Sequence, residues 1–123
     1  MTTFRVTDHA AAARAAAQLP DAARQLGARL VVGAQGLRGL EVTATPAEVL
    51  AAVARARRAQ VRADDSLGQL FLLLADAGAS ARSIAAATGM HHSAVRARIE
   101  KARAARDDEK ALAEIANAEA GTA

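Results

Sequence analysis

The near-absence of aromatic side chains is the feature that most constrains this chain. Phe4 and Phe71 are its only aromatic residues apart from histidine, although hydrophobic residues make up 52% of the 123 positions. A core must therefore be assembled from alanine, leucine, valine and isoleucine around these two phenylalanines. Such small side chains favour closely packed helices, and the length allows one domain or two very small ones. We expect no large enclosed active site.

Several functional classes find no support in the residues. There is no cysteine, which excludes disulfides, thiolate metal sites and cysteine nucleophiles and is compatible with a reducing cytoplasm. The start "MTTFRVTDH" has no apolar signal region, and no stretch is long enough to cross a bilayer. No serine, histidine or acid forms a catalytic pattern, and His91 and His92 lack a third metal ligand. We expect a cytoplasmic, nucleoid-associated protein that is no enzyme and needs no cofactor or metal.

The first half of the chain predicts a helix, a β-hairpin and a second helix. Asp8 is a candidate N-cap, Pro20 either kinks the first helix or opens another, and Gly27 is a candidate stop. The run "ARLVVGAQGLRGLEVTA" places glycines between short apolar segments, which favours a β-hairpin over residues 30–44. "TPAE" at 45–48 predicts a capped helix that runs to about Arg62. We expect an N-terminal α-ββ-α module over residues 1–62, available for dimerisation.

The second half predicts a unit of three helices followed by an acidic C-terminal segment. "ADDS" at 63–66 indicates a break and a new N-cap, and "LGQLFLLLADA" at 67–77 has the spacing of a core helix. Residues 107–123 form either an acidic C-terminal helix or a tail. The predicted fold class is mainly α with one β-hairpin, in which a trihelical helix-turn-helix unit over residues 63–106 follows the α-ββ-α module.

The stretch "GASARSIAAATGMHHSAVRARIEKAR", residues 78–103, carries the helix-turn-helix prediction. Ser80 caps a short helix over residues 81–88, Gly89 supplies a left-handed turn, and a second helix begins at about His92. Ala85 must be small because the second helix crosses over it. The predicted core of the motif comprises Ile84, Ala85, Gly89, Met90, Val95 and Ile99.

The residues of this stretch that are not predicted to belong to the core form an outward-facing, basic surface. The positions that would read bases are His91, His92, Ser93, Arg96, Ala97 and Glu100. The positions that would bind phosphates are Ser80, Arg82, Arg98, Lys101, Arg103 and Arg106. A recognition helix places such residues at its start and along its flanks. Residues 1–106 hold fifteen basic and eight acidic groups, whereas 107–123 hold one and five, and a basic body suits a partner with phosphates.

This stretch resembles the helix-turn-helix of region four of bacterial sigma factors and of related response-regulator domains, over about residues 66–106. The positions that carry the resemblance are Ile84-Ala85, Gly89, Ser93, Val95, Arg96, Arg98-Ile99 and Lys101-Ala102-Arg103. The resemblance implies a major-groove helix with His92, Ser93 and Arg96 facing bases. The chain departs from the pattern at Ala86, where an acidic or polar residue is common, and it has no counterpart of the sigma segment that binds the minus-ten element. A complete sigma factor is therefore not expected.

Together these features predict a small sequence-specific DNA-binding protein, a dimeric transcriptional regulator of the repressor type. Its partners would be double-stranded DNA and a second copy, because a single recognition helix reads few base pairs. Two alternatives stay open: a plasmid or phage DNA-maintenance protein for partition, packaging or replication control, and a protein-interaction module that binds no DNA. The second would use the same motif to hold a protein such as RNA polymerase. The remaining alternative to DNA binding is an alanine-rich three-helix packing unit that binds nothing.

Overall fold

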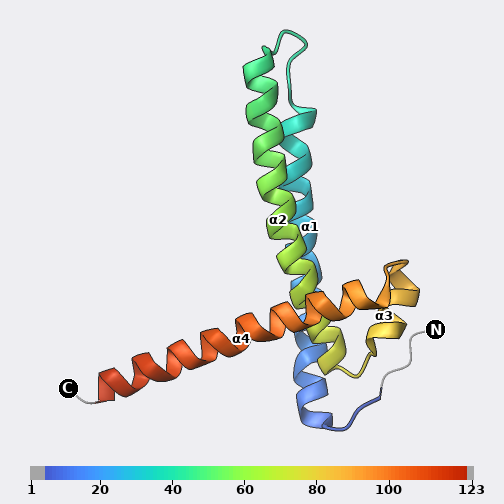
Figure 1. Cartoon of the computed structure of the whole chain (residues 1–123), viewed down its shortest axis with the longest axis vertical. Coiled ribbons are helices and arrows are strands. Elements are labelled where there is room, and N and C mark those ends of the chain that lie inside the picture. The colour runs from blue at the N-terminus through green and yellow to red at the C-terminus, as the bar shows by residue number, and fades with distance from the viewer. Residues whose placement is uncertain (1–4, 122–123) are drawn as a thin grey trace.

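The structure is a computed structural model that describes residues 5–121. Over this range the chain forms four helices, α1 (His9–Arg38), α2 (Pro46–Asp76), α3 (Ala81–Thr88) and α4 (His92–Gly121). Helices α1 and α2 lie side by side as a long antiparallel hairpin (Figure 1). Helix α4 crosses this hairpin near its base, and its C-terminal part projects beyond it, while α3 lies beside the N-terminal end of α4 (Figure 1).

The β-hairpin predicted over residues 30–44 is wrong, and so is the α-ββ-α module built on it. Helix α1 continues through this stretch to Arg38, and residues 5–121 contain no β-strand. The positions of α1 that are shielded from solvent recur every three or four residues, which is the period of a helix with one packed face. These positions are Ala12, Ala15, Leu19, Ala22, Leu26, Arg29 and Gly33. Gly27 does not stop the helix, and Pro20 lies within it.

A glycine that suggested a turn instead allows the two helices to approach each other. A Cβ atom on Gly33 would lie 3.1 Å from the Cβ of Ala59. Shielded positions on α2 repeat with the same alternation of four and three residues as those on α1, and most of them are small. The positions in this row are Ala52, Ala56, Ala59, Ala63, Ser66, Leu70 and Leu73, and α2 has further buried positions, such as Gly68, Phe71 and Leu72, outside it. The hairpin is therefore an antiparallel pair of helices with a narrow seam of small residues, as the lack of aromatic side chains requires.

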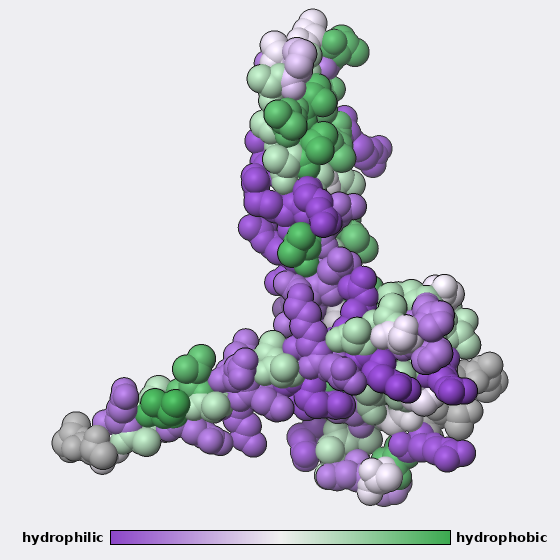
Figure 2. All heavy atoms as spheres, viewed as in Figure 1, coloured by the Kyte–Doolittle hydropathy of each residue, from purple (hydrophilic) through white to green (hydrophobic). Residues whose placement is uncertain are grey.

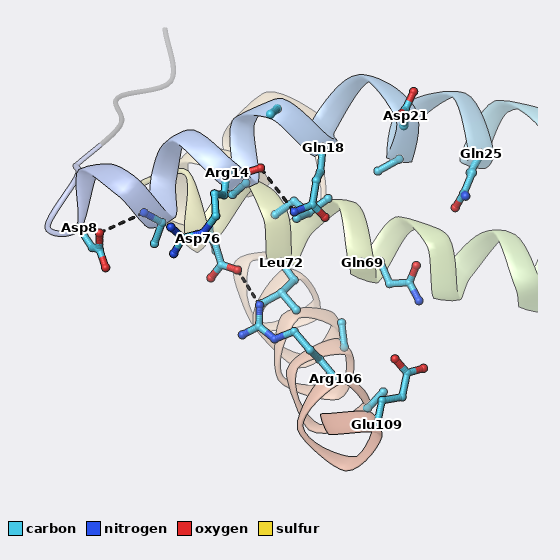
Figure 3. A pocket seen from close by; sticks show the side chains of 18 of the residues that line it. Asp8, Arg14, Gln18, Asp21, Gln25, Gln69, Leu72, Asp76, Arg106 and Glu109 are labelled. Carbon is cyan, nitrogen blue, oxygen red and sulfur yellow. Dashed lines mark hydrogen bonds and ion pairs between the residues drawn. The ribbon is translucent and has the colours of Figure 1, made fainter. Parts of the chain in front are cut away.

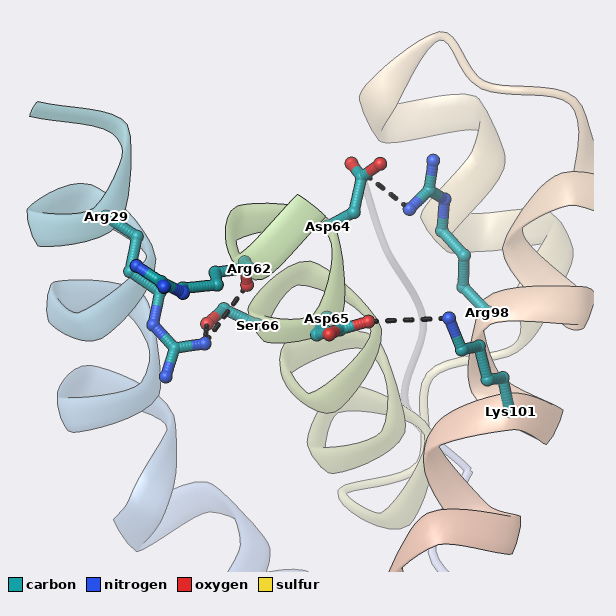
Figure 4. A network of polar contacts seen from close by, with 7 residues as sticks. All are labelled: Arg29, Arg62, Asp64, Asp65, Ser66, Arg98 and Lys101. Atoms are coloured by element: carbon teal, nitrogen blue, oxygen red, sulfur yellow. Dashed lines mark hydrogen bonds and ion pairs between the residues drawn. The ribbon is translucent and has the colours of Figure 1, made fainter. Parts of the chain in front are cut away.

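The predicted helix end at Arg62 and the new N-cap at 63–66 are also wrong. Helix α2 runs without a break from Pro46 to Asp76, so one helix joins the two predicted units. Ser66 is 3% exposed and caps nothing. Its hydroxyl accepts a hydrogen bond from the guanidinium of Arg29, which also donates to the carbonyl of Arg62 over 3.0 Å (Figure 4). A polar residue in the seam is thus satisfied by a cation from α1, which stabilises the pair.

Three of the predicted N-caps are confirmed. The side chain of Asp8 accepts a hydrogen bond from the backbone N–H of Ala11, and that of Thr45 accepts one from Glu48. Ser80 accepts one from Ser83 at the start of α3. These side chains satisfy backbone donors that have no partner inside a helix.

The core lies where α2, α3 and α4 meet. Phe71 is 2% exposed and Val95 is fully buried, and both belong to a cluster of buried residues that also holds Leu72, Ala79, Ile84, Ala85 and Ile99. Gly68 lets α4 cross α2 closely, since a Cβ there would lie 3.2 Å from the carbonyl oxygen of Arg98. Phe4, the other phenylalanine expected in the core, lies outside the described residues. None of the described helices is long and apolar enough to span a membrane.

Candidate nucleic-acid interface

The turn between α3 and α4 sets the position of the predicted recognition residues. Gly89 has φ +72° and ψ 10°, the left-handed conformation that glycine adopts without strain, and its N–H donates to the carbonyl of Ala85 over 2.9 Å. Ile84, Ala85, Val95 and Ile99 are buried on the two sides of this turn, and the partly buried Met90 packs against the same cluster. The start of α4 is therefore held on the core, with its outer face in solvent.

His91 acts as the N-cap of α4. Its carbonyl accepts hydrogen bonds from the N–H groups of Ala94 and Val95, over 3.0 and 3.1 Å. Its ring Nδ1 accepts the N–H of Ser93 over 3.2 Å and lies 2.7 Å from the Ser93 hydroxyl oxygen. The His91 and His92 rings are stacked, with centroids 4.6 Å apart. The Nδ1 of His91 is therefore occupied by Ser93, and one face of its ring is covered by His92. Besides the base-reading role predicted for it, His91 has a structural role at the start of α4.

A positive cluster forms around His92. The pKa of His92 lies below its ordinary value, first because the ring is partly desolvated and then because the charges of His91, Arg82 and Arg96 oppose a further proton. Arg82 belongs to α3, so charges from both α3 and the start of α4 act on the His92 ring. An anion bound here would be attracted by both arginines and would favour the protonated ring.

The cations of α4 divide between two sides of the helix. Because successive residues turn by about 100° around an α-helix, His92, Arg96 and Arg103 share one side, and Arg98 lies about 160° away from Arg96. Arg98 and Lys101 form ion pairs with Asp64 and Asp65 of α2, each over 3.4 Å (Figure 4). Arg106 pairs with Asp76 over 2.7 Å (Figure 3). Three of the cations predicted to bind phosphates thus contact the hairpin.

The remaining predicted contact residues are accessible. Arg82, Arg96 and Arg103 are exposed, and none of them has a carboxylate partner within 4.0 Å in residues 5–121. Ala97 and Glu100 are exposed as well. The Ser80 hydroxyl is exposed but engaged, because it accepts from the N–H of Ser83 and lies 3.0 Å from the Ser83 hydroxyl.

Sequence reasoning missed the acids of α2 that hold α4. In the sequence, Asp64 and Asp65 indicate a helix break, and nothing assigns a role to Asp76. Their partners lie 30 to 36 residues later in the chain, so only the packing of α4 across α2 reveals the pairs. No signal within either segment predicts them.

A concavity lies between the N-terminal half of α1, the end of α2 and the middle of α4. It has a volume of about 1040 Å³ and is open to solvent. Acids, arginines and glutamines alternate along its walls, including Asp8, Arg14, Asp21 and Glu109 (Figure 3). Because acidic and basic side chains are mixed in this lining, it favours neither an anionic nor a cationic ligand. Across residues 5–121, no three histidine or acidic side chains gather closely enough to hold a metal ion.

No family model, curated protein or solved structure matches this chain.

Proposed function

We propose that this protein is a small sequence-specific DNA-binding regulator that inserts the N-terminal end of α4 into the major groove. The observation that carries the proposal is the cluster of Arg82, from α3, with His92 and Arg96, from the α4 start that follows the Gly89 turn; its arginines have no carboxylate partner among the described residues. The major groove is about 12 Å wide and admits one α-helix. The buried residues of α3 and α4 give that helix a rigid support.

Each exposed side chain of the cluster has a distinct role in this mechanism. Arg96 offers two parallel N–H donors, the pattern that matches O6 and N7 of guanine. His92 and Ser93 contact neighbouring base edges, while His91 orients them through its cap and its stacked ring. Arg82 and Arg103 bind phosphates on the two sides of the groove and set the register.

The cations that pair with α2 have a different task. Arg98, Lys101 and Arg106 fix the angle at which α4 crosses the hairpin through their contacts with Asp64, Asp65 and Asp76. Exposed ion pairs of this kind contribute up to about 1 kcal/mol each. We therefore assign phosphate binding to Arg82 and Arg103 and exclude these three from the main contact set.

Selection of bound sequences from a pool of random duplexes tests the proposal. The protein should enrich one motif, and the motif should disappear when Arg96 and His92 are both changed to alanine. A motif with two-fold symmetry would indicate a dimeric regulator, and tandem repeats would indicate a DNA-maintenance protein. Binding that enriches nothing and fades as salt rises, or no binding at all, would contradict site-specific readout.

A further inference from the structure

Within residues 5–121, two apolar surfaces are exposed to solvent, and they lie at different extremities. One is a groove between α1 and α2 near the far end of the hairpin, with a volume of about 470 Å³. Leu30, Gly33, Leu37 and Val53 line it together with Arg29 and Arg57. We call it the tip groove. The other is the projecting part of α4, residues 107–121, which we call the arm. Figure 2 shows hydrophobic side chains gathered at both places.

Within residues 5–121 of one copy, the apolar side chains of the arm are not buried against another element. Every residue of α4 from position 103 onward is exposed, including Leu112 and Ile115 at 67% and 56%. These two side chains are three residues apart and so share one side of the helix. A solvated helix of about 15 residues is marginally stable by itself in water. Burial of Leu112 and Ile115 against an apolar surface would supply the missing stabilisation.

Charge selects which surface the arm can join. Residues 107–121 hold five acids and one lysine, a net charge of −4. Residues 28–62, which form the tip groove and its surroundings, hold six arginines and two glutamates, a net charge of +4. Two tips repel each other and two arms do likewise, whereas an arm and a tip attract each other. The apolar side chains of the arm, Leu112 and Ile115, could in addition be buried against the apolar lining of the groove.

The arm cannot reach the tip groove of its own chain. Helices α2 and α4 are each continuous, and α4 crosses the base of the hairpin and leads away from its far end (Figure 1). The occupant of the groove must therefore come from another molecule. We propose that the arm of one copy docks in the tip groove of a second copy, and that the second arm docks reciprocally in the first groove.

Reciprocal exchange forms a closed dimer with two equal arm-to-tip contacts related by a two-fold axis. The dimer would place two copies of α3 and α4 on one particle. This assembly does not depend on DNA binding, so it is tested on the full-length protein without DNA. Failure of the assembly test and failure of DNA selection are therefore distinguishable.

The test is the molar mass in solution, measured by light scattering across protein concentrations and at two salt concentrations. The wild-type protein should be a dimer that dissociates more readily at high salt. Leu112→Ser/Ile115→Ser should raise the dissociation constant by about a hundredfold or more, because two branched side chains lose their burial. Val42→Ser is the matched control, since Val42 is fully exposed in the α1–α2 connection and lines no groove. Circular dichroism checks that each variant remains helical.

Charge reversal makes the test specific for the pairing. Arg57→Glu/Gln60→Glu gives the groove acidic walls, and Asp108→Lys/Glu109→Lys removes the negative charge of the arm. Each variant alone should be monomeric at concentrations where the wild type is a dimer, and an equimolar mixture of the two should form dimers. The proposal is overturned if the wild type is monomeric at tens of micromolar, if the Leu112/Ile115 variant dimerises like the wild type, or if the mixed reversals do not pair.

Discussion

At the scale of single residues, neighbouring side chains with similar chemistry have different surroundings. His91 accepts a backbone hydrogen bond at its Nδ1, whereas the ring of His92 has two arginines in its electrostatic field. Arg96 is unpaired among the described residues, while Arg98, two positions later, contacts Asp64. The role of each residue therefore follows from the side of α4 on which it lies, and the following predictions test single positions.

DNA affinity should increase as the pH falls, and His92 should cause part of the increase. The pKa of His92 is lowered in the free protein, so the ring is neutral at pH 7. Phosphates would raise this pKa, so binding takes up a proton and becomes tighter as pH falls from about 8 to about 5.5. Titrations monitored by fluorescence anisotropy at several pH values measure the effect.

His92→Gln should flatten this pH dependence, and His9→Gln, at the start of α1, should not. An affinity independent of pH in the wild type, or an equal slope in His92→Gln, would exclude His92 from the interface. The stability of the fold should depend on pH in the opposite direction to DNA affinity. Stability from the neutral ring is present above pH about 6.5 and declines as pH falls towards the lower pKa of the folded chain.

Gly78→Ala should lower the free energy of unfolding by about 1–3 kcal/mol. Gly78 has φ +113°, and an added Cβ would lie 2.7 Å from the carbonyl oxygen of Arg5. Gly36→Ala is the matched control, because nothing lies within 4 Å of a Cβ there and φ is helical. The control should raise stability by about 0.5–1 kcal/mol. Urea unfolding followed by circular dichroism compares them, and equal stability of the two variants would refute the strained geometry.

At the scale of the elements, three helix starts could be predicted, and the full lengths of α1 and α2 could not. Asp8, Thr45 and Ser80 are residue types that favour helix N-caps, and the side chain of each caps a helix in the structure. The sequence pattern of the second half of α1 is misleading because its shielded positions, Leu26, Arg29 and Gly33, include a cation and a glycine and so give a weak apolar period. Gly33 then resembled a turn residue, whereas its function is to bring α1 against Ala59 of α2. Only the partner helix supplies that information.

Gly33→Leu should destabilise the hairpin by about 1–3 kcal/mol, because the added side chain overfills the seam against Ala59. Gly27→Leu makes the same change at a position of α1 where nothing lies within 4 Å, and it should be neutral or stabilising. Thermal unfolding of the two variants provides the comparison. If Gly33→Leu unfolds at the wild-type temperature, the close approach of α1 and α2 is not as described.

The candidate site shows the same division between local and tertiary information. The turn at Gly89 and the buried residues beside it lie within 25 positions of one another, and their pattern is readable in the sequence. The pairing of Arg98 and Lys101 with α2 is not, because it depends on how α4 crosses the hairpin at Gly68. The set of proposed phosphate contacts is smaller than predicted for this reason.

At the scale of the whole molecule, the long hairpin and the projecting arm exceed what is needed to support α3 and α4. The cluster of large buried side chains lies where α2, α3 and α4 meet, and the described extremities carry opposite charge and exposed apolar side chains. We propose that α3 and the start of α4 bind DNA, and that the tip groove and the arm serve dimerisation. Association would give the two recognition helices a fixed spacing, which a two-fold symmetric site requires.

The measurement that tests the central claim most directly compares Arg96→Ala with Lys101→Ala on the selected DNA site and on random DNA. Arg96 faces the proposed groove, and Lys101, on the other side of the same helix, pairs with Asp65. Arg96→Ala should lose about 1–3 kcal/mol on the selected site and much less on random DNA, while Lys101→Ala should change both only slightly. Equal losses on both DNAs for Arg96→Ala, or a larger loss for Lys101→Ala, would contradict base reading by this face of α4.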